Sequence, residues 1–242
     1  MKLQVESFGS ETEWARGIAD RWQERLTANP ALRHCLAAGL TPVRIYAEMI
    51  RRVREGSARF GDARIFLLDE YGGLAPDDPG RCANMLRRFL VDHLDLPPSA
   101  FFTPSVDAPD LDAACREYDA TIGGGFDLVL LGIGTNGHVG MNEPGTPVDI
   151  DTHRAGLHVE TVTSSARYMN HDRFPTWGLT IGLRPLLAAR EVWLLATGAA
   201  KAGIVARLLA EEAHSDLPAS WFRDHPNARL FLDRAAAGDV LA

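Results

Sequence analysis

The sequence has little cysteine and no apolar run long enough to cross a membrane. Its three cysteines, Cys35, Cys82 and Cys115, are odd in number and fall in no metal-ligand spacing, which argues against a disulfide framework and a thiolate metal cluster. No stretch approaches the roughly 20 apolar residues that a membrane span requires. The first residues carry no apolar segment typical of a secretion signal. We therefore expect reduced thiols, no membrane partner and a cytoplasmic location.

A concentrated basic region is also missing. The 25 lysines and arginines are mixed with 32 acidic residues, which gives a formal net charge of −7. Arginine occurs in pairs, at residues 51–52 and 87–88, and never in a long block. Nucleic acid binding normally needs a concentrated positive surface, so it is not expected. A small anionic ligand remains compatible with this composition, because one or two well-placed cations hold a phosphate even on an acidic protein.

What is present is enough apolar material for a full core, in an alternating order of strand-like and helix-like segments. Of the 242 residues, 46% are hydrophobic, with no repeat and no linker. The alternation predicts one α/β domain over residues 1–242, with a Rossmann-like, mainly parallel sheet and helices on both faces. Strands are expected near residues 3–8, 33–37, 64–68, 126–132, 156–162, 177–182, 191–197 and 228–233.

Two helix starts carry local capping signals. Residues 10–13, Ser-Glu-Thr-Glu, resemble a capping box, in which the side chains satisfy free amides at a helix start. Thr41 followed by Pro42 predicts a second start, with a hydroxyl cap and a proline in the first turn. Further helices are expected near residues 81–94, 109–122 and 199–211.

Polar or glycine-rich segments follow four of the expected strands, at residues 39–41, 69–71, 132–143 and 198–201. In an open α/β sheet, ligands bind outside the carboxyl ends of the strands. One polar strand end means little, but four that share one edge of the sheet predict a single binding site.

The loop at residues 132–143 is the strongest of these segments. Its glycines, among them Gly134 and Gly137, let the backbone approach a ligand and turn free amides toward oxygen atoms. His138 is suited to both proton uptake and release near neutral pH. Glu143 follows five residues later and can orient the imidazole. The alternative is a tight turn whose histidine only caps a helix; the surrounding glycines, Asn136 and Glu143 favour a functional loop.

Two acids, Asp69 and Glu70, follow an apolar strand directly. Neighbouring like charges raise each other's pKa, and a carboxylate with a raised pKa suits the removal of a proton from carbon beside a carbonyl. The alternative is a solvated turn in which one acid caps the next loop. Lys201 and Arg167 are candidate phosphate ligands, although a single cation is more commonly a surface charge.

Two motifs carry a resemblance to a known family. LLDEYGGL, at residues 67–74, and LLGIGTNGHVGMNEPGTP, at residues 130–147, resemble the glucosamine-6-phosphate deaminase (isomerase) family. Related 6-phosphogluconolactonases share the first half of the second motif but lack its Asn-Glu-Pro ending, which favours the deaminase branch. Further likeness at residues 179–202 and in the tail DHPNARLFLD extends the resemblance over nearly the whole chain.

The resemblance implies that an aldose 2-amino-sugar 6-phosphate becomes the ketose 6-phosphate and ammonia, with no metal or organic cofactor. By position, Asp69 matches the base that moves the C2 proton to C1, and His138 matches the acid/base that opens the sugar ring, supported by Asn136 and Glu143. The resemblance and the loop chemistry together assign the remaining contacts to substrate or phosphate binding: Gly39, Thr41, Glu70, Gly134, Gly137, Arg167 and Lys201.

The sequence departs from the family pattern at three places. Asn136 stands where some members have Asp, so Glu143 must carry more of the charge stabilisation of His138. The first phosphate turn, residues 38–41, reads Ala-Gly-Leu-Thr where deaminases usually have a hydroxyl and more glycine. The cations that bind an allosteric amino sugar in regulated members are replaced near His153 and Ala155, so no such activation is expected.

Several activities remain open on these residues. Glucosamine 6-phosphate is the leading substrate, and its galactosamine epimer is the nearest alternative. Lactone hydrolysis needs no carboxylate base at Asp69 and leaves the Asn-Glu-Pro ending unexplained. A catalytically silent sugar-phosphate-binding regulator would be favoured if the acids were missing, yet they are present. A monomer and a homo-oligomer are both compatible with the sequence.

Overall fold

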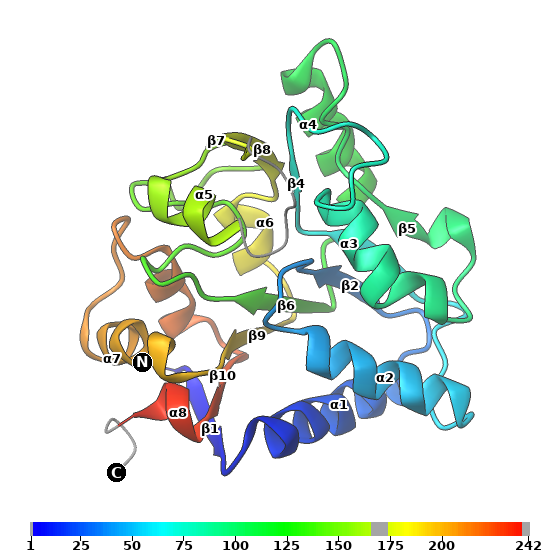
Figure 1. The fold of residues 1–242 in the computed structure, drawn as a ribbon, viewed down its shortest axis with the longest axis vertical. Coiled ribbons are helices and arrows are strands. Elements are labelled where there is room, and N and C mark those ends of the chain that lie inside the picture. Colours follow the sequence, from blue (N-terminus) through cyan, green and yellow to red (C-terminus); the bar gives the residue numbers. More distant parts are fainter. Residues whose placement is uncertain (1, 166–173, 239–242) are drawn as a thin grey trace.

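Seven parallel strands form the main sheet among the residues that the computed structural model describes, 2–165 and 174–238. Their order is β1-β10-β9-β6-β2-β3-β5 (Figure 1). The strands are β1 Gln4–Phe8, β2 Arg33–Leu36, β3 Arg64–Leu67, β5 Phe101–Phe102, β6 Leu128–Gly132, β9 Glu191–Ala196 and β10 Ala228–Asp233. The first and last strands of the chain therefore pair at one edge.

Helices cover both faces of this sheet, as the alternation in the sequence predicts. Along β6, Leu128 and Leu130 pack with the helices of one face, whereas Val129 and Leu131 pack with those of the other. The first face carries α1 Glu11–Ala28, α2 Val43–Arg54 and α3 Cys82–Phe89. The second carries α4 Leu111–Ile122, α6 Leu183–Leu187 and α7 Ala202–Ala210. Short turns of helix complete the chain: η1 Val91–His93, η2 Pro98–Ala100, η3 Ala199–Lys201, η4 Pro218–Asp224 and α8 Arg234–Ala237.

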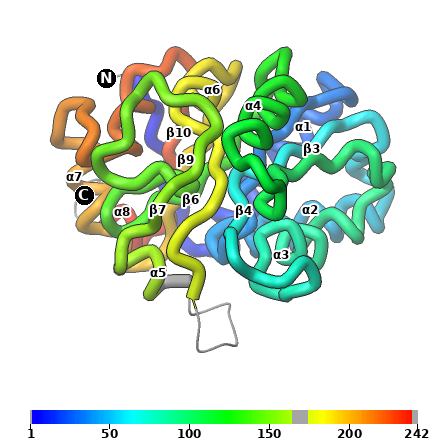
Figure 2. The backbone as a smooth tube through the Cα atoms, turned by 90° about the horizontal axis from the view of Figure 1, so that it is seen from above, coloured from blue at the N-terminus to red at the C-terminus, as the bar shows by residue number. Residues whose placement is uncertain are grey.

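A smaller antiparallel sheet stands above the main one in Figure 1, and Figure 2 looks down on it. Its order is β4-β8-β7, with β4 Asp69–Tyr71, β7 His153–Gly156 and β8 Trp177–Thr180. The strand expected at residues 156–162 is wrong, because β7 ends at Gly156 and helix α5, Val159–Ser165, follows. The alternating apolar pattern of that segment is misleading, since Val159 is 75% exposed.

The two capping signals have different outcomes. Ser10 accepts a hydrogen bond from the amide of Glu13 at 3.2 Å, which confirms its half of the predicted capping box. The predicted Thr41 cap is wrong: α2 begins after Pro42, and no side chain caps it. Thr41 instead borders the cavity at the carboxyl ends of the strands.

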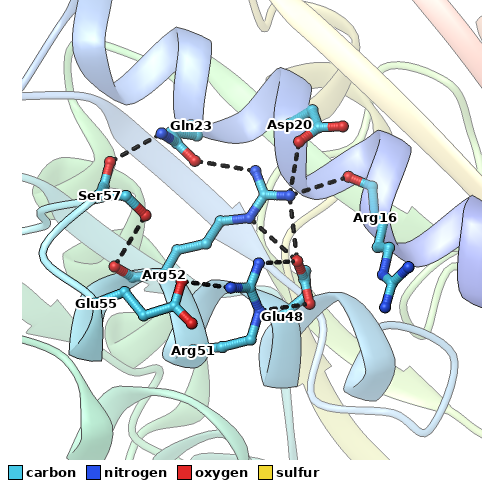
Figure 3. Close-up of polar contacts among 8 residues, drawn as sticks. All are labelled: Arg16, Asp20, Gln23, Glu48, Arg51, Arg52, Glu55 and Ser57. Atoms are coloured by element: carbon cyan, nitrogen blue, oxygen red, sulfur yellow. Dashed lines mark hydrogen bonds and ion pairs between the residues drawn. The ribbon is translucent and has the colours of Figure 1, made fainter.

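A buried arginine braces α1 against α2, as Figure 3 shows. The Arg52 side chain is only 7% exposed; its guanidinium lies 2.7 Å from Asp20 Oδ1 and donates to Gln23 Oε1 at 3.0 Å, both on α1. Glu48 Oε1 lies 3.3 Å from the same guanidinium. A buried charge is tolerated only when it is paired in this way.

His34 is a fully buried histidine in the core beneath this brace. Its Nδ1 accepts a hydrogen bond from Trp22 Nε1 at 3.0 Å, so the neutral ring carries its proton on Nε2. No partner of Nε2 is found among the described residues. Burial lowers the pKa of His34 to about 3.

This histidine should make the fold sensitive to mild acid. The unfolded chain takes up the proton near pH 6.5, whereas the folded chain resists it down to about pH 3. His34 therefore does not reduce the free energy of unfolding above pH 6.5. Below pH 6.5, the free energy of unfolding falls by roughly 1.4 kcal/mol for each pH unit. Urea unfolding between pH 7 and 4.5 should show a shallower loss for His34→Gln than for the wild type. His93→Gln, at an exposed histidine, should behave as the wild type; equal slopes in all three proteins would contradict the expectation.

Candidate active site

A cavity of about 740 Å³ lies at the carboxyl ends of β9, β6, β2 and β3, which are consecutive neighbours in the sheet. The four segments expected to share one edge all contribute to its wall. The lining residues include Gly39, Leu40, Thr41, Asp69, Cys82, Gly134, Thr135, His138, Glu160, Thr161 and Lys201. The structure thus brings together residues that are as far apart in sequence as 39 and 201.

The predicted site residues fall into three groups. Six border the cavity: Gly39, Thr41, Asp69, Gly134, His138 and Lys201. Asn136 and Glu143 contact His138 and each other without bordering the cavity themselves. Glu70 and Gly137 do not border it, and Arg167 lies outside the described residues.

Asp69 is half-buried at the first position of β4 and faces the cavity. Burial, which penalises the charged form, raises the pKa of Asp69 to about 7. A hydrogen bond from the Cys82 thiol opposes this rise, and the charge of Glu70 adds to it. A carboxylate with this pKa is half deprotonated near neutral pH, which suits a general base.

Glu70 has a structural role, closer to the capping alternative than to ligand binding. Its carboxylate accepts hydrogen bonds from the backbone amides of Tyr71 at 2.8 Å, Cys82 at 2.8 Å and Ala83 at 2.9 Å. It thereby holds the N-terminus of α3 against β4. Consecutive side chains of a strand point to opposite faces, so when Asp69 faces the cavity, Glu70 must face away. The expectation that both acids contact the ligand overlooked this alternation.

The hydrogen bonds at Nδ1 of His138 determine which ring nitrogen carries the proton. The carboxylate of Glu143 only accepts, so Asn136 donates from Nδ2 to Glu143 Oε2 at 2.8 Å. Asn136 therefore directs Oδ1 toward the ring, 2.7 Å from His138 Nδ1. An oxygen at that distance requires a proton on Nδ1. The neutral imidazole then has an unprotonated Nε2, which is able to accept a proton from a ligand.

The electrostatic surroundings of His138 are mixed. Burial is the largest influence and lowers the pKa of His138 below its usual 6.5. Glu143, whose Oε2 lies 3.6 Å from Nδ1, raises that pKa, as does Glu160. Lys201 and His158 lower it. The ring is therefore neutral at pH 7 and ready to act first as a base.

Two of the glycines have packing reasons for being glycine. A Cβ on Gly134 would lie 2.3 Å from the imidazole of His138, so any side chain there would displace the ring. Gly137 has a positive φ of 93° and would meet Leu217 at 2.3 Å. Gly134 therefore shapes the site by making room for His138, and Gly137 by forming the turn behind it.

Lys201 reaches the cavity from η3 and donates to the carbonyl of Ile133 at 2.6 Å. This contact holds the ammonium group beside the glycine-rich loop, in the same cavity that Gly39 and Thr41 line. A cation beside a glycine turn and a hydroxyl is an arrangement that binds phosphate oxygens.

Sequence reasoning missed three residues that contact the catalytic candidates. Thr161 Oγ1 lies 3.1 Å from His138 Nδ1, and the backbone amide of His158 donates to Glu143 Oε1 at 3.3 Å. Cys82 hydrogen-bonds Asp69. Thr161 and His158 belong to the segment that was expected to be a strand, and Cys82 carried no motif. No signal in the single sequence marked any of them.

Neither a cluster of metal-ligand side chains nor a membrane-spanning helix is present in the part of the chain that the structure describes. Within residues 2–165 and 174–238, no three His, Cys, Asp or Glu side chains are placed to hold a metal ion. Over the same ranges, every helix is too short or too polar to cross a membrane.

Comparison with known proteins agrees with this geometry. Residues 10–231 match the family described as glucosamine-6-phosphate isomerases/6-phosphogluconolactonase. A glucosamine-6-phosphate deaminase of Bacillus pumilus (strain SAFR-032) is 40% identical over 204 residues, which cover 83% of this chain and 85% of the relative. The same-named protein of Rhodopirellula baltica (strain DSM 10527 / NCIMB 13988 / SH1) is 38% identical over 238 residues, 97% of this chain and 95% of the relative.

Solved structures give the same result. A monomeric glucosamine-6-phosphate deaminase superposes with a TM-score of 0.94 at 34% identity, over 97% of this chain and 99% of the other. A 6-phosphogluconolactonase from Trypanosoma brucei superposes with a TM-score of 0.72 at 22% identity, over 100% and 99% of the two chains, and shows the fold alone. The chain belongs to the glucosamine-6-phosphate isomerase/6-phosphogluconolactonase family.

Proposed function

We propose that this protein is a glucosamine-6-phosphate deaminase, which converts glucosamine 6-phosphate and water to fructose 6-phosphate and ammonia. The observation that carries the proposal is the pairing of a carboxyl group, Asp69, and an imidazole, His138, on one cavity beside Lys201. Relatives that are 38–40% identical over most of their length bear this name. Three buried free cysteines support a reducing, cytoplasmic location as part of the same proposal.

His138 opens the sugar ring in this proposal. Its unprotonated Nε2 takes the proton from the C1 hydroxyl and returns it to the ring oxygen, so that the C1 aldehyde forms. The resulting imidazolium is stabilised by Glu143, which lies 3.6 Å from Nδ1. Asn136 fixes the tautomer through its 2.7 Å contact. No net proton is gained or lost by the enzyme in this step.

Asp69 then moves a proton between two carbon atoms. The aldehyde acidifies the C2 hydrogen, so the carboxylate abstracts it while the C1 oxygen takes up a proton, which gives an enolamine. Asp69 then delivers its proton to C1 as the nitrogen gives one up, so that C1 becomes an alcohol and C2 an imine. The imine adds water and releases ammonia, leaving the ketose. A base with a pKa of about 7 both accepts and returns this proton near neutral pH. The requirement for a carboxylate facing the cavity favours deamination over lactone hydrolysis.

The phosphate is assigned to the part of the cavity lined by Gly39, Thr41 and Lys201. Gly39 and Thr41 supply a turn and a hydroxyl, and Lys201 supplies a positive charge. Arg167 completes this set by resemblance. Glu70 and Gly137 are assigned to the support of the site rather than to the ligand, since neither borders the cavity.

The test is a coupled assay of ammonia and ketose formation with four compounds. These are glucosamine 6-phosphate, galactosamine 6-phosphate, unphosphorylated glucosamine and 6-phosphogluconolactone. We expect turnover of glucosamine 6-phosphate, and a loss of at least 10²-fold in kcat/KM without the phosphate, since a phosphate held by charged groups contributes roughly 3 kcal/mol. Preference for galactosamine 6-phosphate would contradict the assigned substrate, and hydrolysis of the lactone alone would contradict the assigned reaction. Tight binding of a sugar phosphate without turnover would indicate a regulator instead of an enzyme.

A further inference from the structure

Helix α5 places a hydroxyl group beside Nδ1 of His138. No motif of the sequence marked this hydroxyl. Thr161 is buried, with 6% exposure, and its Oγ1 lies 3.1 Å from His138 Nδ1. It approaches the same nitrogen that Asn136 contacts at 2.7 Å. Two oxygens from different elements therefore face one ring N–H.

The direction of these hydrogen bonds follows from Glu143. Because Glu143 only accepts, Asn136 turns its oxygen to His138, and Nδ1 must carry the proton. Thr161 then accepts from that same N–H. An N–H donor binds an oxygen more strongly once the ring is protonated, because the bond becomes charge-assisted.

We propose that Thr161 is a positioning residue for His138, holding the ring with Nε2 unprotonated and stabilising the imidazolium formed during ring opening. The proposal rests on the proposed function, in which His138 is the acid/base. Asn136 supplies no charge to the imidazolium. Each further oxygen on Nδ1 therefore has a larger share in holding the proton that His138 takes up.

The charges around His138 show why one neutral oxygen matters. Glu143 and Glu160 favour the protonated ring, whereas Lys201 and His158 oppose it, and burial opposes it most. A hydrogen bond that favours the protonated ring acts in the same direction as the two glutamates and against burial. These four side chains come from the glycine-rich loop, α5 with the residue just before it, and η3.

The start of α5 also contacts Glu143, the residue behind Asn136. The amide of His158 donates to Glu143 Oε1 at 3.3 Å. The segment from His158 to Thr161 thus contacts both the ring and the carboxylate that supports it. The pKa of His138 consequently depends on the position of α5. Because α5 also borders the cavity, the shape of the cavity and proton transfer by His138 depend on the same helix.

The experiment titrates His138 in the ligand-free protein by NMR, with isotope-labelled histidine and His138→Gln to assign the signal. Thr161→Val keeps the shape of the side chain and removes the hydroxyl, and Thr161→Ser keeps the hydroxyl. We expect Thr161→Val to lower the pKa of His138 by about half to one unit, and Thr161→Ser to leave it within about 0.2 units. Thr161→Ala, a second way to remove the hydroxyl, should reproduce the valine result.

Thr163→Val is the matched control, since the Thr163 hydroxyl lies on the same helix and donates to the carbonyl of Val159 at 2.7 Å. It should leave the His138 titration at the wild-type value. An unchanged pKa in both Thr161→Val and Thr161→Ala would overturn the proposal, and so would an equal shift in Thr163→Val.

A second readout uses ring opening alone. In an Asp69→Asn background, exchange between the α- and β-anomers of glucosamine 6-phosphate reports His138 without the later step. Adding Thr161→Val should move the acid limb of this exchange to lower pH by the same amount as the NMR titration. If the wild type turns over no amino-sugar phosphate, the proposed function fails, while the ligand-free titration still decides the contact between Thr161 and His138.

Discussion

Asp69→Asn is expected to lower ammonia release from glucosamine 6-phosphate by about 10²- to 10⁴-fold, the usual contribution of a positioned general base. Asparagine keeps the size of the side chain at the cavity wall but accepts no proton at physiological pH. Exchange of the C2 hydrogen with deuterated solvent should be lost to the same extent. Binding should persist, because the change leaves the residues assigned to the phosphate, Gly39, Thr41 and Lys201, untouched.

The pH dependence of the wild type belongs to the same prediction. Asp69 acts as the carboxylate and has a pKa of about 7, so kcat/KM should fall as the pH drops below about 7. The pKa of His138 is below 6.5, so its ring is already neutral at pH 7. The fall of kcat/KM below pH 7 therefore reports Asp69. Asp62→Asn removes an exposed acid and serves as the matched control. Unchanged C2 exchange in Asp69→Asn would remove Asp69 from the role of base.

His138→Gln is expected to cost a similar factor, about 10²- to 10⁴-fold, at a different step. Glutamine offers no nitrogen that takes up a proton, so the enzyme must wait for the sugar ring to open by itself. Deamination should then reach a ceiling as enzyme is added, equal to the rate of spontaneous opening. His93→Gln, at an exposed histidine outside the cavity, should leave turnover at the wild-type level.

The two variants are best compared by anomer exchange. Asp69→Asn should still accelerate the interconversion of the α- and β-anomers, since His138 is intact. His138→Gln should not. NMR exchange spectroscopy on glucosamine 6-phosphate measures this directly. Loss of anomer exchange in Asp69→Asn, or its retention in His138→Gln, would reverse the two assignments.

The edge of the sheet that forms the site was predictable from the sequence, because parallel strands end on the same side. The strand at residues 126–132 and the glycine-rich loop after it are so apolar and so rich in glycine that local pattern alone indicates them. The last strand was expected at the bounds that β10 has, Ala228–Asp233. These elements are determined by their own residues.

The predictions that failed concern segments whose conformation depends on residues far away in the sequence. The segment before and within α5 alternates like a strand, but it leaves the sheet at Gly156 and borders the cavity instead. Thr41 has the chemistry of a helix cap, yet its position at the end of β2 directs it to the cavity. The role of Glu70 depends on α3, which begins twelve residues later at Cys82. A single sequence does not record such pairings.

The neighbouring pair Asp69 and Glu70 has a consequence for which changes in length the protein tolerates. One carboxylate works in the cavity while the next one anchors a helix, and only the alternation of β4 keeps them apart. Inserting or deleting one residue in this strand would exchange the two faces. The anchored acid would then enter the cavity, and the base would be turned toward the start of α3. The motif should therefore accept substitutions nearby far more readily than any insertion or deletion.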